Sequence, residues 1–380
     1  MRSLFANLLR KLRLPDTVQN AAPLAQGGVS LHALAAANPP MADHFIWRHE
    51  VWPDGVHGAH VQFGCGPNPL NGFINFDFLP NGQDVFAFNM LNIWPDTRTD
   101  MAAIYSEDVL EHFFLNEQFY ILSSMNCSLR PGGIVRALMP NLQTLWNYQQ
   151  VFDLDQLLSR GDFLASTLGC RSGADAFNMG MRMGGHRWLH VPDSFARLAR
   201  ACGFRCHNSR CDTSLDPRMN GINIRQEPFS FAVDLELERP IKRLVVMPEA
   251  VEGADLIETV AKGQHLWRAG ARATITYRLK PVATTNVTCL NVRSANLAQF
   301  KEHNFASIQF APASGGGTFH VDRTLHSTPY MNTASGDDLR RLLDNPWFDE
   351  VVFRPGAAGD YFTTGPLELF VLTDSVNGLP

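Results

Sequence analysis

The chain has 380 residues, 45% of them hydrophobic and 18% charged, with a formal net charge of −5. This composition is typical of a folded chain and excludes an intrinsically disordered one, and the length predicts two or three domains. The negative charge gives no general attraction to nucleic acid. Seven cysteines without a CxxC pair indicate reduced thiols and a cytoplasmic protein. No apolar run approaches the roughly 18 residues that a membrane span needs.

Residues 1–48 are predicted to form a helix followed by a linker. Within residues 1–14, leucine and phenylalanine recur at helical spacing among basic residues, and no acidic residue is present. Such a basic amphipathic helix can lie on the anionic inner face of a membrane. Docking onto the protein itself or onto a partner is the alternative. Residues 21–40 are rich in Ala, Pro and Gly, which is typical of a linker.

Residues 49–238 alternate between strand and helix patterns, which predicts an α/β domain with a mainly parallel sheet. Only a handful of residues separate the first two predicted strands, whereas a parallel crossover normally needs a dozen or more. We therefore expect an abbreviated first crossover without a full helix. Strands are predicted at 59–63, 73–76, 84–88, 102–106, 133–139, 203–207 and 229–237, and helices near 107–128, 141–169 and 192–202.

The stretch HVQFGCGPNPLNGFINFD, residues 60–77, indicates a nucleoside site. Its glycines let backbone approach a ligand closely, and Asp77, at the tip of the second strand, can accept hydrogen bonds from two ribose hydroxyls. A dinucleotide fingerprint needs a third glycine and an acid about 20 residues further on. Here Pro69 replaces that glycine and Asp77 follows Gly66 too early. A P-loop motif is absent as well. A plain turn between two buried strands is the structural alternative.

The stretch IYSEDVLEHFFLNEQFYILSSMNCSLRPGGIVRALMPNL follows, in residues 104–142. It predicts a strand end, a helix against the sheet, a Pro-Gly-Gly stop and a further strand. Acidic residues at a helix start are commonly explained by the helix dipole. That explanation covers Glu107 and Asp108 but not Glu111 and His112, which lie one turn further on.

Four segments of the chain carry a family resemblance. GCGPNPLNGFINFD, YSEDVLEHF, LRPGGIVRALMPNL and FNMGMRMGGHRW resemble the class I S-adenosylmethionine-dependent methyltransferases. They are most similar to the group common in bacterial polysaccharide and surface-glycan loci. The resemblance covers roughly residues 55–238. It implies a Rossmann-like, seven-stranded sheet with the last strand antiparallel, and S-adenosylmethionine bound over the ends of the early strands.

The resemblance also implies which residues surround the cofactor. Relatives often have Asp where this chain has Asn89, and His where it has Asp108, so the pocket departs from the family pattern at both positions. The implied cofactor contacts are Gly64, Cys65 and Gly66 at the methionine part, Asp77 at the ribose hydroxyls, Asn89 and Met90 at the adenine, and Ser106 and Glu107 at the methionine amino end and the reacting methyl.

Methyl transfer to a hydroxyl needs an acceptor oxygen held in line, about 3 Å from the methyl group, and benefits from a base. Histidine is suited to that task near neutral pH. Two candidates are His112, after the fourth strand, and His186, in the segment Gly-Gly-His-Arg-Trp. For His112 a hydrogen bond within the core is the alternative.

The acceptor is predicted to be a carbohydrate or a glycan precursor. Arg187 can bind an acidic or phosphorylated group, and Trp188 can stack on a sugar face. Asp108 and Asn141 follow strands that end at the same edge of the sheet, so we assign both to the acceptor side. Asp108, Glu111 and His112 could supply ligands to a divalent ion, but their spacing alone does not support one. No metal site is predicted from the sequence.

Residues 239–380 change in character. Short apolar runs separated by turn residues every 8–15 positions are the signature of a β-sandwich, with one short helix expected at 336–345. FDEVVFRPGAAGDYFTTGPLELF is similar to sandwich modules appended to bacterial glycosyltransferases and other polysaccharide enzymes. Trp267, Tyr330 and Trp347 could stack on sugars or lie in the core. Glycan binding and a structural role in dimerisation or docking both stay open, and the sequence does not give the oligomeric state.

The expected function is therefore methylation, in the cytoplasm, of a sugar hydroxyl on a surface polysaccharide or its precursor. The alternative is a scaffold protein with a degenerate methyltransferase fold that binds a glycan or a partner. A nucleic-acid substrate is not expected, because the chain has no basic stripe interleaved with aromatic residues. It also lacks the Pro-Pro-Tyr/Phe motif of DNA amino-methylating enzymes after its fourth strand.

Overall fold

The computed structural model describes residues 51–80, 82, 84–95, 100–150, 153, 155, 158, 169–182, 185–225, 227–261, 264–293, 309–312, 318–322, 332–335, 347–355 and 358–373. The helix and linker predicted in residues 1–48 lie outside this part of the chain. So do Tyr330 and the helix predicted at 336–345.

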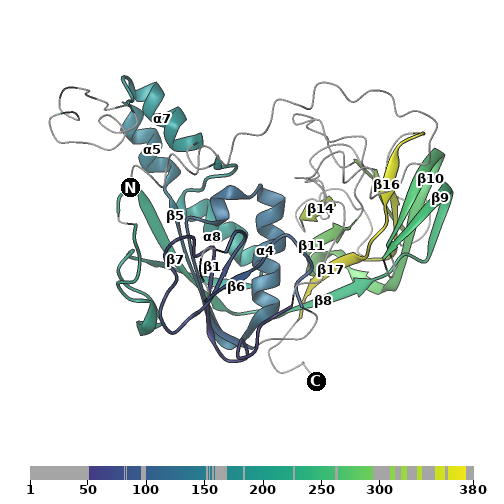
Figure 1. The fold of residues 1–380 in the computed structure, drawn as a ribbon, viewed down its shortest axis with the longest axis horizontal. Coiled ribbons are helices and arrows are strands. Elements are labelled where there is room, and N and C mark those ends of the chain that lie inside the picture. The colour runs from purple at the N-terminus through teal and green to yellow at the C-terminus, as the bar shows by residue number, and fades with distance from the viewer. Residues whose placement is uncertain are drawn as a thin grey trace.

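The N-terminal described domain is built on one seven-stranded sheet (Figure 1). The strand order is β3-β2-β1-β4-β5-β7-β6, with β1 to β5 parallel and β7 antiparallel to both of its neighbours. All seven predicted strands are confirmed, although β5 begins earlier than expected. The strands are β1 (His60–Phe63), β2 (Ile74–Asp77), β3 (Val85–Ala87), β4 (Met101–Glu107), β5 (Leu129–Pro140), β6 (Phe204–Ser209) and β7 (Ser230–Leu237).

The helices differ more from the prediction. The helix expected at 107–128 is two elements, because Glu107 still belongs to β4 and the Glu117 carboxylate caps a new helix start by accepting the Phe114 N–H at 2.8 Å. A further helix, α7, was not predicted. The described helices of this domain are η3 (Leu110–His112), α4 (Leu115–Ser128), α5 (Leu142–Gln150), α7 (Gly173–Arg182), α8 (Pro192–Ala201) and η6 (Pro217–Met219).

The first crossover is short, as expected. β1 and β2 pair in parallel, yet the residues between them form only turns. Aromatic rings pack against this part of the sheet: the Trp52 ring stacks on Phe88 with centroids 4.9 Å apart. It also meets Phe63, Phe76 and Trp94. This cluster buries the apolar face that a crossover helix would otherwise cover.

From Ile241 onward the described chain is an all-β domain of two sheets. One sheet has the order β12-β13-β15-β10-β16 with β9 paired to β10, and the other has the order β14-β11-β17-β8. Both sheets contribute side chains to one hydrophobic core, as a sandwich requires. The strands are β8 (Ile241–Val246), β9 (Ala250–Ala261), β10 (Gln264–Ala283), β11 (Val287–Val292), β12 (Gln309–Pro312), β13 (Thr318–Asp322), β14 (Asn332–Ser335), β15 (Trp347–Arg354), β16 (Tyr361–Thr363) and β17 (Leu367–Leu372), with the short helix η7 (Thr284–Asn286) before β11.

Of the aromatic residues considered for sugar stacking, Trp267 is half-buried and donates its indole N–H to the Thr364 hydroxyl at 3.3 Å. Trp347 is 45% exposed. A sugar-binding role for either residue stays a prediction.

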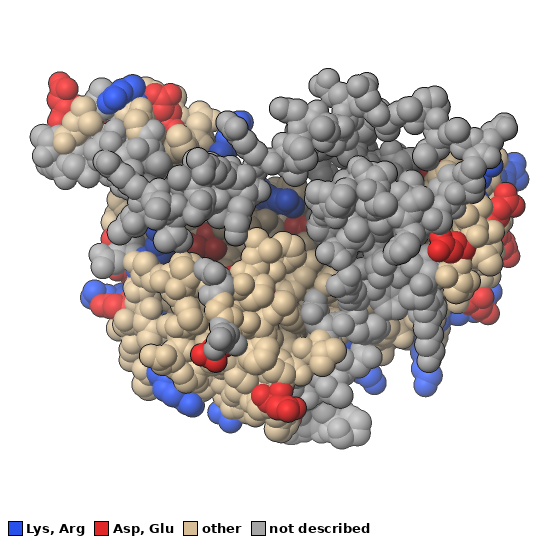
Figure 2. All heavy atoms as spheres, in the orientation of Figure 1, with Lys and Arg blue, Asp and Glu red and all other residues tan. Residues whose placement is uncertain are grey.

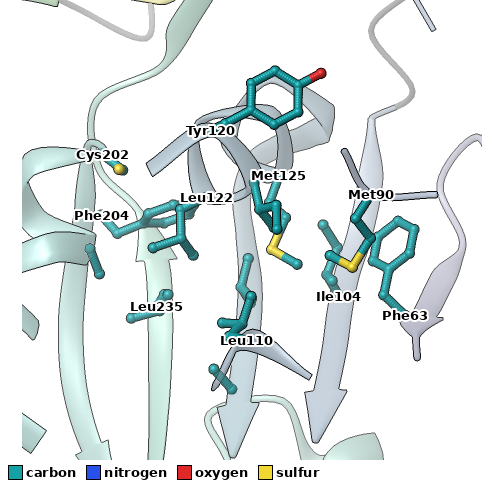
Figure 3. Close-up of a cluster of buried hydrophobic side chains, with 14 of the residues drawn as sticks. Phe63, Met90, Ile104, Leu110, Tyr120, Leu122, Met125, Cys202, Phe204 and Leu235 are labelled. Atoms are coloured by element: carbon teal, nitrogen blue, oxygen red, sulfur yellow. The ribbon is translucent and has the colours of Figure 1, made fainter. Parts of the chain in front are cut away.

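Helix α4 lies between the two domains (Figure 1). Figure 3 shows Leu122 and Met125 of α4 among side chains of the seven-stranded sheet. The same core cluster includes Phe370 of the β domain. Because α4 is buried on nearly all sides, its polar groups need partners. The Asn126 side chain of α4 makes three hydrogen bonds: its oxygen accepts from the Ile241 N–H, and its amide donates to the Cys202 and Arg239 carbonyls. The two domains therefore share one continuous core.

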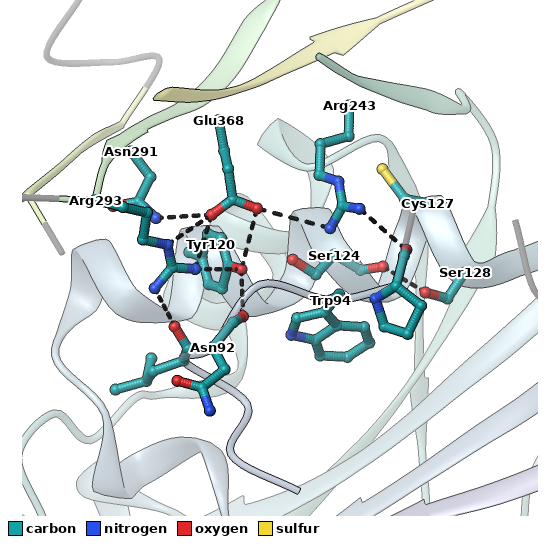
Figure 4. Close-up of polar contacts among 12 residues, drawn as sticks. Asn92, Trp94, Tyr120, Ser124, Cys127, Ser128, Arg243, Asn291, Arg293 and Glu368 are labelled. Carbon is teal, nitrogen blue, oxygen red and sulfur yellow. Dashed lines mark hydrogen bonds and ion pairs between the residues drawn. The ribbon is translucent and has the colours of Figure 1, made fainter. Parts of the chain in front are cut away.

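A buried charged network joins the same parts (Figure 4). Glu368 of β17 is fully buried and pairs with the Arg293 guanidinium at 2.7 Å. Arg243 of β8 lies 3.6 Å from its other oxygen. Arg293 in turn donates to the Tyr120 hydroxyl of α4 at 2.6 Å and to the Leu91 carbonyl. One carboxylate thus compensates two arginines at the junction of the domains.

We expect Glu368→Ala to lower the free energy of unfolding by about 3–5 kcal/mol, because it leaves Arg293 buried without its counter-charge. Urea unfolding measures the loss. Glu249→Ala is the matched control. It breaks an ion pair with Arg278 whose side chains are 53% and 65% exposed, so we expect it to cost about 0–1 kcal/mol. Equal losses in the two variants would contradict the structural role of the network.

In the described part of the chain, no helix has the length and apolar character needed to cross a membrane. On the face shown in Figure 2, the described Lys and Arg side chains lie apart from one another and form no basic patch.

Candidate active site

The glycine turn after β1 and the end of β2 meet directly. The Gly66 N–H donates to Asp77 Oδ2 at 2.8 Å, and the Leu79 N–H donates to Asp77 Oδ1 at 2.8 Å. The Gly64 N–H donates to the Phe76 carbonyl at 2.8 Å. These bonds fix the Asp77 carboxylate beside the turn. Because β1 and β2 are parallel, both features lie at the carboxyl edge of the sheet, where open α/β sheets bind ligands.

The two outer glycines of the turn have different surroundings. Both have positive φ, 70° at Gly64 and 52° at Gly66. A Cβ on Gly64 would lie 2.3 Å from the Val109 side chain, whereas a Cβ on Gly66 would meet no atom within 4 Å. Gly64 therefore lets the turn pack against the segment after β4, and Gly66 leaves open space beside Asp77.

We expect Gly64→Ala to destabilise the protein by about 1–3 kcal/mol, since it adds a methyl group against Val109 in a backbone conformation that L residues avoid. Val109→Ala in the same chain should restore part of this loss. Gly66→Ala should show only the backbone cost of about 1–2 kcal/mol, with no rescue by Val109→Ala. Urea unfolding of the three single and two double variants measures the coupling. Zero coupling between positions 64 and 109 would contradict the packing described.

Cys65 lies between these glycines, and we expect its backbone, not its side chain, to face a cofactor. Its side chain is 4% exposed, and burial, with the Asp77 charge second, raises the pKa of its thiol to about 11. The thiol is therefore protonated at neutral pH. We still predict that the main chain at Cys65 lies beside the methionine part of the cofactor.

Asn89 and Met90 follow β3 at the same edge. The Asn89 side-chain oxygen accepts the Leu91 N–H at 3.0 Å, which shapes the turn after β3. The Met90 side chain is 6% exposed and packs in the core near Phe63 and Ile104 (Figure 3). If Met90 flanks an adenine, it does so mainly through its backbone.

Ser106 and Glu107 end β4. The Ser106 hydroxyl is buried and has no hydrogen-bond partner among the described residues. The Glu107 carboxylate accepts from the Ile224 and Arg225 N–H groups at 2.8 and 2.7 Å and from the Tyr105 hydroxyl at 3.0 Å. Burial raises its pKa, and these hydrogen bonds act against that shift. Glu107 thus holds the segment around Ile224 over the end of β4.

Glu111 and the Gly-His-Arg-Trp segment are brought together by main-chain bonds. The Glu111 carbonyl accepts from the Arg187 N–H at 2.8 Å and the Trp188 N–H at 3.2 Å. The buried Gln118 amide donates to the Leu110 carbonyl at 2.8 Å and the Trp188 carbonyl at 3.3 Å. This bonding places His186 beside η3, far from its position in the sequence.

The result is a compact group of Glu111, His112 and His186. One ligand atom from each of the three lies within 4.8 Å of the other two. The imidazole centroids of the two histidines are 5.2 Å apart, and His186 Nε2 lies 3.9 Å from Glu111 Oε1. The two histidines assigned to catalysis from the sequence therefore lie together.

The ionisation of this group departs from that of free side chains. Burial raises the pKa of Glu111 well above its usual value, and the Asp108 charge adds to the effect. Burial lowers the pKa of His112, opposed by interactions with the backbone of Gly185 and of Asp108. Burial, and next the neighbouring His112, lowers the pKa of His186. Both imidazoles are therefore neutral at neutral pH and can accept a proton.

Three of the predicted acceptor residues border this group. Asp108 has a positive φ of 55° and pairs with the Arg225 guanidinium, while its Oδ1 is buried without a hydrogen-bond partner in the described chain. Arg187 is exposed, with its guanidinium 5.0 Å from the centre of the Phe114 ring. Trp188 is 43% exposed. Their exposed surfaces are available to an acceptor.

Asn141 has a structural task in addition to any contact with an acceptor. Its side-chain oxygen accepts the Gln143 N–H at 3.0 Å at the start of α5, and its N–H donates to the Phe229 carbonyl. These bonds position α5 after β5. An acceptor contact from Asn141 stays a prediction.

Sequence reasoning missed several residues that build the site. Gln118 and His190 are buried and bonded to each other at 2.7 Å, and together they hold the His186 segment against η3. Arg225 arrives from a segment that the sequence did not connect with β4. The unexplained Glu111-His112 pair one turn beyond the predicted helix start was the available signal for Glu111.

No protein-family model matches the chain, and no curated protein matches it. Solved structures similar to it include human N-acetylserotonin methyltransferase in complex with SAM, at 11% identity and a TM-score of 0.28, over 55% of this chain and 55% of that chain. A SAM-dependent methyltransferase from Archaeoglobus fulgidus is similar at 14% identity and a TM-score of 0.28, over 55% of this chain and 94% of that chain. An S-adenosylmethionine-dependent methyltransferase from Mesorhizobium loti is similar at 13% identity and a TM-score of 0.30, over 55% of this chain and 100% of that chain.

At these identities and TM-scores the fold assignment rests on this chain's own topology. The order β3-β2-β1-β4-β5-β7-β6 with β7 antiparallel defines a class I methyltransferase sheet, Rossmann-like in type, joined to a C-terminal all-β domain.

Proposed function

We propose that the protein is an S-adenosylmethionine-dependent O-methyltransferase that acts on a sugar hydroxyl of a surface polysaccharide or its precursor. The observation that carries this proposal is the junction of Gly66 and Asp77, bonded at 2.8 Å at the carboxyl edge of a class I methyltransferase sheet. The resemblance of four segments of the chain to methyltransferases of glycan loci supports the acceptor class.

The residues at this edge suit such a cofactor. Space beside Gly66 is open, the Asp77 oxygens are fixed by main-chain bonds, and the buried Ser106 hydroxyl needs a partner. Asp77 would hold the ribose hydroxyls, and the turn would lie along the methionine part. When bound, S-adenosylmethionine supplies an activated methyl group. Val109 packs against Gly64 and precedes Glu111 and His112 by two and three residues, which supports a position of both side chains near the cofactor.

The chain's own contribution to the reaction is to orient an acceptor and take up its proton. His186 Nδ1 lies 3.0 Å from the Gly180 carbonyl, which favours a proton on Nδ1 and leaves the Nε2 lone pair free. His186, or His112 beside it, would accept the proton of the acceptor hydroxyl. Arg187 and Trp188 would bind the acidic group and the ring face of a glycan.

The test is transfer of a labelled methyl group from S-adenosylmethionine to a panel of nucleotide-linked sugars and short glycans. We expect label in an alkali-stable ether on at least one sugar. Reactions without the protein, or with nucleic acids as acceptors, should give no labelled product. Cofactor binding without transfer to any carbohydrate would overturn the acceptor class. The absence of cofactor binding would favour the alternative, a scaffold protein with a degenerate methyltransferase fold.

The cellular setting belongs to the same proposal. A glycan precursor made in the cytoplasm, at the inner face of the membrane, would meet the enzyme there. The basic segment at residues 1–14 would supply the peripheral contact with that membrane.

A further inference from the structure

Glu111 is a buried carboxylate without compensation. Its exposed fraction is 0%, and neither oxygen has a hydrogen-bond partner among the described residues. Among the described residues, the only basic group within 4.0 Å of its oxygens is His186 Nε2, and its distance of 3.9 Å is too long for a hydrogen bond. Buried carboxylates are normally paired, hydrogen-bonded or bound to a metal ion, because a lone charge in the interior is costly.

The surroundings of Glu111 are acidic. Asp108 has one buried oxygen with no hydrogen-bond partner among the described residues, and its other oxygen already pairs with Arg225. Arg225 is 54% exposed, so its charge is largely screened by water. The site therefore combines unsatisfied carboxylate oxygens with two imidazole rings. A small cation satisfies that combination.

The imidazoles have the support that metal-binding histidines usually have. Such a histidine commonly gives its second ring N–H to a backbone carbonyl, which fixes the ring and directs the other nitrogen to the metal. His186 Nδ1 lies 3.0 Å from the Gly180 carbonyl, and its Nε2 faces Glu111. The backbone of Gly185 and of Asp108 likewise interacts with the His112 ring.

We propose that Glu111, His112 and His186 bind one divalent transition-metal cation of the Zn²⁺, Mn²⁺ or Fe²⁺ class. Two imidazoles and one carboxylate are a ligand set for these ions, whereas Mg²⁺ and Ca²⁺ prefer oxygen ligands alone. At metal–ligand distances of about 2.0–2.2 Å, two ligand atoms lie at most about 4.4 Å apart. The observed atoms lie within 4.8 Å of one another, so a small closing movement of the side chains completes the site.

Three protein ligands leave the ion an open position, as in catalytic metal sites. The role of the ion rests on the proposed function. An acceptor hydroxyl at the open position would have a lowered pKa, and a histidine nitrogen bound to the metal would not act as the base. Binding of the ion does not depend on methyl transfer.

The experiment uses tag-free protein stripped with a chelator, then dialysed against Zn²⁺, Mn²⁺ or Co²⁺ and analysed for bound metal. We expect about one ion per chain in the wild type and a Co²⁺ visible spectrum typical of nitrogen and oxygen ligands. Glu111→Gln and His186→Ala should weaken binding by at least about 100-fold. His207→Ala is the control, because His207 pairs with Glu236 on the surface of β6 and β7, and it should bind as the wild type does.

Thermal melting provides a second readout that does not involve activity. Without metal, Glu111→Gln should melt at or above the wild-type temperature, because it removes a buried carboxylate that has no partner. Added metal should raise the melting temperature of the wild type but not that of Glu111→Gln.

The inference is overturned if the stripped wild type takes up no metal, if Glu111→Gln binds as tightly as the wild type, or if His207→Ala weakens binding as much as His186→Ala. S-adenosylmethionine binding is measured on the same stripped protein. A wild type that binds S-adenosylmethionine but no metal would contradict this inference alone. A wild type that binds metal but no S-adenosylmethionine would contradict only the proposed function.

Discussion

Replacing Asp77 with alanine is expected to weaken the binding of S-adenosylmethionine by about 10- to 150-fold, or 1.5–3 kcal/mol, the cost of losing hydrogen bonds to a charged group. The carboxylate has two tasks. It would accept from the ribose hydroxyls, and it already accepts the Gly66 and Leu79 N–H groups that shape the turn. Both are lost in the variant. Titration calorimetry measures the change.

Asp84→Ala is the matched control for this prediction, because Asp84 is an exposed carboxylate just before β3. It should leave the affinity unchanged. Asp77→Asn should bind better than Asp77→Ala, since the amide oxygen still accepts one N–H of the turn. Wild-type affinity in Asp77→Ala would remove the ribose assignment and, with it, the geometry on which the cofactor proposal depends.

His186→Ala is expected to lower methyl-transfer turnover by about 10²- to 10⁴-fold, the usual range for losing a group that assists proton removal. Its affinity for S-adenosylmethionine should stay close to wild type, because the described contacts of the His186 ring are with Glu111, His112 and the Gly180 carbonyl. His112→Ala should show the same pattern. Single-turnover assays with saturating cofactor separate the chemical step from binding.

His207→Ala again serves as a control that should keep full turnover. Wild-type turnover in both His112→Ala and His186→Ala would exclude either residue from activating the acceptor. The metal-stripped wild type then separates two ways of activation. If a free histidine is the base, the stripped enzyme keeps its turnover. If a bound cation activates the acceptor, the stripped enzyme loses its turnover and regains it when the metal is restored.

The strands of the sheet were predictable because each is a short apolar run bounded by turn residues, and the periodicity of such runs is local. The abbreviated first crossover was also predictable, because only a handful of residues separate the first two strands. Helix α7 was missed because its glycines lower helix propensity. Gly180 is accepted there because a Cβ would lie 2.7 Å from the Leu145 side chain of α5, so tertiary packing requires the glycine.

The candidate site was predictable in part. Gly66 and Asp77 are close in sequence, and their contact follows from the turn between two parallel strands. The grouping of Glu111 with His186 was not predictable, because it depends on Gln118 and on the Glu111 carbonyl holding a distant segment. Spacing within YSEDVLEHF offered only adjacent candidates for a metal site, and the ligand that completes the set comes from beyond α7.

The β domain is part of the same folded unit as the methyltransferase sheet. Its Glu368 and Arg293 meet Tyr120 of α4 in the interior, and Phe370 and Leu372 belong to the core around α4. A sequence pattern gives each domain separately but not this shared core, because the contacts join residues far apart in the chain. Packing in one domain therefore contributes to the stability of the other.

The most direct test of the central claim is a crystal structure with S-adenosylhomocysteine bound. We predict density along Gly64–Gly66, with the ribose hydroxyls on the Asp77 carboxylate and the sulfur directed towards Glu111, His112 and His186. A protein that binds no S-adenosylhomocysteine, or binds it away from the carboxyl edge of β1 and β2, would contradict the account.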